Sequence, residues 1–300
     1  MRTPVELSSP RSVASATAGC ALALLVASLP LPAQQSQQTQ SQQTQSAAGD
    51  APGWPITSPM PSHGRVIPDP TNGMERPEST SEGACSLWTV EETQRATVST
   101  DALQVPEKAK GEFGKACGDV RRDKLAGAEQ HLRKAVQIYP KYAAAWVLLG
   151  QVLEAEKRTR DAQNACSQAT TVDANYTSAF LCLADVEAQQ EQWSQALMMS
   201  ERALALAPAA GVYGHFYSAM AEFHLGDLAA AERNALDSIG DDRAHRIPQT
   251  HLLLAQIYGS KNDLNGAANE LRTYLKIAPK GPDAENVRRS LAQLESRINK

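Results

Sequence analysis

The chain has 300 residues, of which 29 are Lys or Arg and 33 are Asp or Glu, so its formal net charge is only −4. These charges are dispersed along the sequence, without the basic face of a nucleic-acid-binding protein or an acidic tail. Aromatic residues make up 5% of the chain, and Pro and Gly gather in its first third. Composition therefore argues against nucleic acid as a partner and against two full-sized globular domains.

Residues 1–33 have the pattern of a signal peptide. Arg2 and Arg11 precede an apolar run, residues 18–31, which has the length of a signal-peptide core and is too short to span a bilayer. Ala33 then offers a small residue for cleavage, just before the sequence becomes polar. We expect export to the periplasm, the cell envelope or the medium, with no mature transmembrane span. The alternative is an accidental apolar run in a disordered tail.

The next segments have little capacity for a packed core. Residues 34–84 are rich first in Gln and Ser and then in Pro and Gly, which predicts a disordered linker. Residues 85–106 form a lead-in segment, in which β-branched residues permit a short strand.

An internal repeat begins after Pro106. Three columns of small residues and prolines recur every 34 residues: Ala128, Ala162 and Ala196; Ala135, Ala169 and Ala203; Pro140, Ala174 and Pro208. The step lengthens to 35 between Ala196 and Ala231 and to 36 between Ala231 and Ala267, which indicates insertions near Gly211 and in the polar loop 240–246. Asp241 and Asp242 in this loop are expected to be solvated rather than to hold a metal.

The repeat resembles the tetratricopeptide repeat (TPR), a 34-residue helix-turn-helix with a W-x2-L-G-x2-Y pattern in its first helix. The pattern is clearest at Trp146, Leu149, Gly150 and Leu153, followed by Ala162 in the second helix. The resemblance implies an all-α, superhelical solenoid in residues 107–281, in which the first helix of each pair lines the concave side. The five expected repeats are 109–142, 143–176, 177–210, 212–247 and 248–281. Residues 282–300 should form an amphipathic capping helix.

The resemblance also implies a function in protein binding. We expect a non-catalytic scaffold of the cell envelope that binds a partner protein or peptide in its concave groove. The alternative is a structural or assembly component, or a solenoid that associates with itself. The sequence contains no phosphate loop, nucleophile elbow or HExxH motif, and we expect no catalytic residue, cofactor or metal.

A stripe in the fourth repeat is the main candidate for partner binding. Its residues recur at spacings of 3, 4 and 3, and are Tyr213, Phe216, Met220 and Phe223, with Tyr217 and His224 beside them. They could form an apolar trough for a partner segment, or they could be core residues. Polar contacts on the same side are expected from Gln151, Glu154, Asp185 and Gln256.

Four cysteines remain after the predicted signal peptide, and an exported protein commonly pairs them. Cys166 and Cys182 lie on helices expected to be packed neighbours, so they could join two repeats or remain reduced core residues. Cys85 and Cys117 could attach the lead-in segment to the first repeat.

Overall fold

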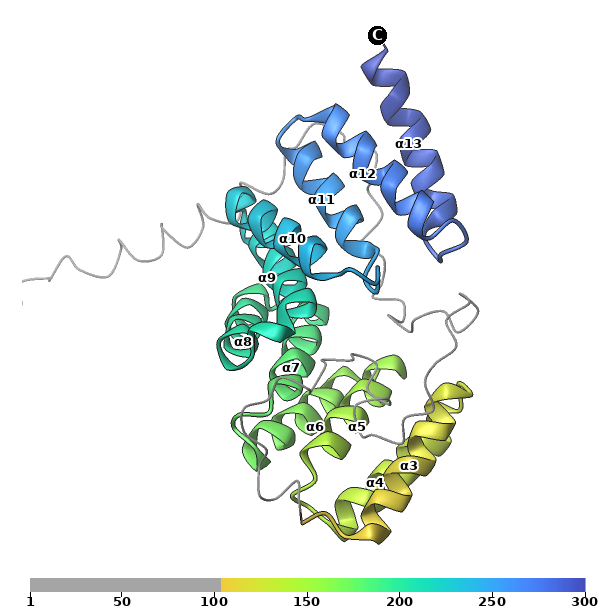
Figure 1. The fold of residues 1–300 in the computed structure, drawn as a ribbon, viewed down its shortest axis with the longest axis vertical. Coiled ribbons are helices and arrows are strands. Elements are labelled where there is room, and N and C mark those ends of the chain that lie inside the picture. Colours follow the sequence, from red (N-terminus) through yellow and green to blue (C-terminus); the bar gives the residue numbers. More distant parts are fainter. Residues whose placement is uncertain (1–103, 300) are drawn as a thin grey trace, which may run out of the picture. The chain divides into compact units, whose positions relative to one another are not determined.

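The computed structural model describes residues 104–299 (Figure 1). This part of the chain contains eleven α-helices and one short 3₁₀ helix, and it has no strand. The five repeats contribute α3 (Glu107–Arg121), α4 (Leu125–Ile138), α5 (Ala143–Ala155), α6 (Thr159–Val172), α7 (Thr177–Gln189), α8 (Trp193–Leu206), α9 (Gly211–Leu225), α10 (Leu228–Asp241), α11 (Gln249–Ser260) and α12 (Leu264–Ile277), and α13 (Ala284–Ile298) follows. The predicted all-α solenoid is confirmed. The predicted signal peptide, the linker and the lead-in segment up to residue 103 lie outside the described residues.

The turn inside each helix pair has the same backbone conformation in all five pairs. One residue per turn has a positive φ, at steps of 34, 34, 35 and 36 along the chain: Asp123, Lys157, Glu191, Gly226 and Asn262. Only the fourth is glycine, the residue that adopts this conformation without steric cost. The left-handed residue reverses the chain tightly enough for the second helix to pack back along the first.

The first helices of successive repeats form one side of the solenoid. Each packs on the second helix of its own repeat, and α5 also contacts α7, α7 contacts α9, and α9 contacts α11. No second helix packs to a similar extent on the second helix of the next repeat in the described part of the chain. The repeats are therefore closer together along their first helices, which form the inner face of the curve.

Small residues bring the two helices of a repeat close together. Ala128, Ala162, Ala196, Ala231 and Ala267, the column on the second helices, are all 0% exposed. Gly150 on α5 faces this column. A Cβ added to it would lie 2.5 Å from Sγ of Cys166 and 3.3 Å from the carbonyl oxygen of Ala162. The period detected in the sequence is thus the period of closest helix approach.

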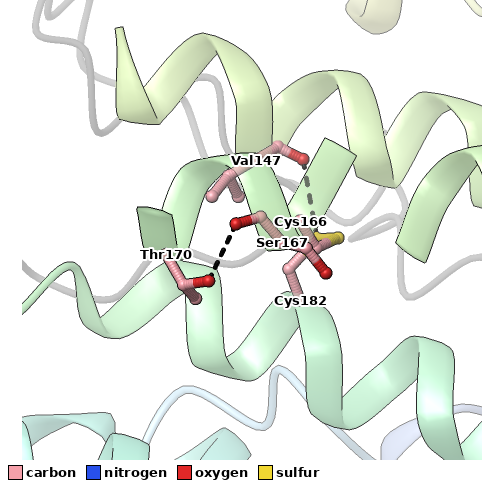
Figure 2. Close-up of a disulfide and its surroundings, with 5 residues drawn as sticks. All are labelled: Val147, Cys166, Ser167, Thr170 and Cys182. Carbon is pink, nitrogen blue, oxygen red and sulfur yellow. Dashed lines mark hydrogen bonds between the residues drawn. A yellow bond between two sulfur atoms is a disulfide. The ribbon is translucent and has the colours of Figure 1, made fainter. Parts of the chain in front are cut away.

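A disulfide joins the second and third repeats (Figure 2). It links Cys166 on α6 to Cys182 on α7, whose Cα atoms are 5.7 Å apart. Both residues belong to the main core, and Sγ of Cys182 lies 3.8 Å from the carbonyl oxygen of Val147. This is one of the two pairings suggested by the sequence. The other involves Cys85, which lies outside the described residues.

The polar loop after α10 is not simply solvated. Asp242 is buried, and its carboxylate accepts hydrogen bonds from the backbone N–H groups of Arg246 and Ile247, at 2.9 and 2.8 Å. The expectation of a solvated Asp242 was therefore wrong, because the carboxylate is needed to satisfy backbone donors in the inserted turn.

The last helix covers the fifth repeat. Val287 and Leu294 of α13 are buried, and Leu291 and Ile298 pack partly against the same cluster. Arg288 and Glu285 on its outer side are 51% and 75% exposed. This polarity is what the open end of a solenoid requires.

Replacement of Gly150 with Ala should test the close helix contact. The new methyl group would meet the disulfide sulfurs, so we expect the free energy of unfolding to fall by about 1 to 3 kcal/mol, measured by urea denaturation. The control is Gly114→Ala in α3, because a Cβ there meets nothing within 4 Å. That change should leave stability unchanged or raise it by up to about 1 kcal/mol. Equal effects at both positions would contradict the packing argument.

Removal of the disulfide should destabilise the solenoid without dismantling it. The linked residues are 16 positions apart, so the double variant Cys166→Ala/Cys182→Ala should lose about 2 to 4 kcal/mol. Urea denaturation measures the loss, and wild type unfolded with reductant is the control. Four blocked thiols in the unreduced mature chain, seen by intact mass, would show that neither bond forms.

Candidate functional site

One residue per repeat occupies the same place on the inner face. We call this set the inner column; its members, at steps of 34, 34, 35 and 36, are Cys117, Gln151, Asp185, Met220 and Gln256. Their exposed fractions are 7%, 3%, 7%, 0% and 9%. The sequence placed the three polar members, Gln151, Asp185 and Gln256, on this side. It did not indicate that they would be buried.

The apolar stripe on α9 is not an open trough. Tyr213, Phe216 and Met220 are all buried and belong to the main core. They are buried because α9 packs on α7 and α11 as well as on α8 and α10. The stripe was predicted to be either a binding trough or part of the core. For these three residues the burial agrees with the core alternative.

The fourth member of the stripe, Phe223, packs partly against the main core, beside an aromatic contact between the third and fourth repeats. Its ring lies 5.4 Å from that of His224, edge to face, and His224 stacks on Trp193 of α8 with centroids 3.7 Å apart. Burial lowers the pKa of His224. The stack keeps an uncharged imidazole between the two repeats, so Phe223 also has a packing role.

A cluster of polar groups crosses three successive first helices. We call Glu154 of α5, Asp185 of α7 and Tyr217 of α9 the acid cluster. The Tyr217 hydroxyl donates a hydrogen bond to the Asp185 carboxyl group. Tyr217 was placed beside the stripe from the sequence, but its bond to Asp185 was missed because no local pattern links residues on different repeats.

The two carboxyl groups of the acid cluster have raised pKa values. Burial, reinforced by the negative charge of Glu154, raises the pKa of Asp185 to about 8. Burial also raises the pKa of Glu154, against the opposing charge of Lys157. The Asp185 carboxyl group is therefore mainly protonated at neutral pH, and a positive charge brought next to it would favour its ionisation.

The described residues give less support to a metal site, a catalytic histidine or a membrane span. No group of three or more His, Cys, Asp or Glu side chains there is arranged to hold a metal ion. His131 and His251 contact carboxylates of their own repeats, Glu112 and Glu270, both at 2.7 Å, and His131 also lies 3.8 Å from Asp119. These pairs join first and second helices and are structural. Residues 104–299 also contain no helix with the length and hydropathy of a membrane span.

Comparisons with known proteins agree with this architecture. Family models of the tetratricopeptide repeat match residues 120–181 and 248–280. No curated protein matches the chain. Among solved structures, the chain is similar to TTC0263, a thermophilic TPR protein of Thermus thermophilus. The sequence identity is 16%, the match covers 62% of this chain and 98% of that one, and the TM-score is 0.51.

Two further structures share the fold. One is PilW, described as a widely conserved type IV pilus biogenesis factor, with 14% identity, coverage of 64% of this chain and 93% of that one, and a TM-score of 0.55. The other is a tetratricopeptide repeat protein from Parabacteroides merdae, with 14% identity and a TM-score of 0.50. The match covers 64% of this chain and 75% of that one. At these identities the likeness concerns the fold alone.

The raised pKa of Asp185 predicts a pH dependence of stability. Between its ordinary value of 3.8 and about 8, the carboxyl group is ionised in the unfolded chain but protonated in the folded one. The unfolded state binds fewer protons than the folded state. The contribution of Asp185 to the free energy of unfolding therefore falls as pH rises through this window. Asp185→Asn should remove that fall and raise the free energy of unfolding by about 1 to 3 kcal/mol at pH 8.

Urea denaturation at pH 5 and pH 8 measures this effect. Glu285→Gln, a neutralised carboxyl group on the exposed side of α13, is the matched control and should change neither value. If the Asn variant loses as much stability between the two pH values as wild type, the folded protein does not hold a protonated Asp185.

Proposed function

Because the chain is a tetratricopeptide-repeat protein, we propose that it is a non-catalytic scaffold that binds a segment of a partner protein in the concave groove of its inner face. Stacked TPR units present one continuous surface across several repeats, which suits an extended ligand. The observation that carries the proposal is the acid cluster, because it spans three repeats on that face. A single bound segment would touch all three.

The chemistry of the cluster favours a basic group on the partner. Asp185 and Glu154 are two carboxyl groups that burial keeps from ionising freely. An Arg or Lys side chain inserted beside them would allow both to ionise and would form charge-assisted hydrogen bonds. Backbone N–H groups of the same segment could bond to the side chains of Gln151 and Gln256. Partner recognition would thus combine one basic anchor with main-chain contacts.

The proposed location is the periplasm or another part of the cell envelope. The signal-peptide pattern of residues 1–33 supports it, and so does the disulfide between Cys166 and Cys182, since disulfides form and persist mainly in oxidising compartments. A structural role within an envelope assembly is the alternative. The exposed charges of α13 count against open-ended stacking of one solenoid on another.

Partner capture should depend on the acid cluster. We expect cross-linked capture from an envelope fraction, followed by titration of the captured partner, to show about a tenfold or greater loss of affinity for Glu154→Gln and for Asp185→Asn. Both changes preserve side-chain size. Glu285→Gln is again the control, because it makes the same chemical change far from the inner face. Undiminished affinity in both cluster variants would place the binding surface elsewhere.

A further inference from the structure

The acid cluster places two carboxyl groups against each other in a largely buried position. Asp185 is 7% exposed and accepts a hydrogen bond from the neutral hydroxyl group of Tyr217. Glu154, on the adjacent helix α5, is close enough for its charge to oppose ionisation of Asp185. Two carboxyl groups so placed retain a proton, because burial and mutual repulsion both disfavour the doubly ionised pair.

Lys157 brings some positive charge to this pair from the turn after α5. Its charge favours ionisation of both Glu154 and Asp185. The lysine is exposed, however, and burial still raises the pKa of Asp185 to about 8. The charge of Lys157 is therefore insufficient to replace the retained proton.

The other two helices packed on α7 contribute different contacts. From α6, the amide of Gln163 donates a 2.8 Å hydrogen bond to Glu187, and from α8, Arg202 lies 5.7 Å from the ring centre of Phe180. Neither the Glu187 carboxylate nor the Arg202 guanidinium is among the groups that shift the pKa of Asp185. Within the described residues, the acid cluster and the lysine of the preceding turn thus determine whether the proton is held.

A partner side chain can approach the pair at Glu154. This residue is only partly buried, whereas Asp185 and Tyr217 are 7% and 2% exposed. A cation arriving from solvent would therefore meet the Glu154 carboxyl group first. Because a guanidinium or ammonium group attracts both carboxylates, its arrival favours the doubly ionised pair, and the retained proton leaves.

We propose that the inner face binds the basic side chain of its partner in exchange for a proton. The Arg or Lys enters at Glu154, the proton held by Glu154 and Asp185 passes to solvent, and the two carboxylates then hold the cation. This inference rests on the proposed function and adds its regulation, because acidification reverses the exchange and releases the partner.

The exchange gives the affinity a pH dependence of definite sign. Between 3.8, the ordinary pKa of an aspartate, and about 8, that of Asp185 in the unbound protein, binding releases up to one proton. Affinity for a basic ligand should therefore rise with pH in this range, by up to about tenfold per pH unit. Above this range the unbound pair is already ionised, and the dependence should level off.

The test uses N-acetyl-arginine methylamide as the probe and its neutral isostere, N-acetyl-citrulline methylamide, as the control. Carbon-13 NMR follows the pH titration of the Asp185 carboxyl group, and Asp185→Asn identifies its signal. Without a probe we expect a midpoint near 8. At constant ionic strength, the saturating arginine probe should lower this midpoint by about one pH unit or more, and the citrulline probe should leave it unchanged.

A variant with one hydroxyl group removed tests the source of the titration. The hydrogen bond from Tyr217 favours the ionised form of Asp185, so Tyr217→Phe should move the midpoint to higher pH. The matched control is Tyr274→Phe, which removes a hydroxyl group 3.5 Å from a carboxylate oxygen of Asp283 near the C-terminal end of the solenoid. This control should leave the midpoint of Asp185 in place.

Three results would overturn the exchange. They are a midpoint near 4 without a probe, an unchanged midpoint with the saturating arginine probe, and an equal shift with the citrulline probe. A midpoint unaffected by Tyr217→Phe would overturn the role of the acid cluster in holding the proton.

Failure of this inference is distinguishable from failure of the proposed function. If partner capture depends on Glu154 and Asp185 but affinity is equal at pH 5 and pH 8, the proposed function holds and the exchange fails. If the arginine probe lowers the midpoint and no partner depends on the cluster, the exchange holds and the proposal of protein binding at this site fails.

Discussion

The close contact between the two helices of each repeat is the constraint on which the rest of the structure depends. It is possible only where side chains are small, as at Gly150 and the fully buried alanine column of the second helices. The column keeps its place when the step lengthens from 34 to 36, because insertions fall in turns rather than in the contact. The left-handed turn residues and the inner column follow the same steps. Helix contact, turn and inner face therefore stay in register in every repeat.

This constraint explains why the fold could be predicted from the sequence. Small residues at a fixed step are a local signal, and they recur, so five weak matches reinforce one another. The turns illustrate the limit. Nothing in Lys157 or Glu191 indicates a left-handed backbone, and tertiary packing imposes it there. Asp242 is similar, because its burial depends on the backbone donors of Arg246 and Ile247, which the inserted turn brings to it.

The candidate site was predicted only in part, for a related reason. The repeat register places Gln151, Asp185 and Gln256 on the inner face, but it does not give the spacing between first helices or the burial of these side chains. A 3-4 periodicity is equally compatible with an open stripe and with a core. Tyr213 and Phe216 lie in the core because α9 is packed on four other helices. Contacts between repeats, such as Tyr217 with Asp185, have no counterpart in a single-repeat pattern.

The acid cluster is unfavourable for the isolated solenoid. Burial of Asp185 near Glu154 disfavours ionisation of both groups, and apolar residues of similar size at these positions would make the repeats more stable. Such a local cost is a common property of binding surfaces, because groups that are poorly satisfied alone gain most from a complementary ligand. A basic anchor on a partner protein would relieve this cost. Selection of a partner would then depend on the contacts beyond the anchor, along the other repeats of the inner face.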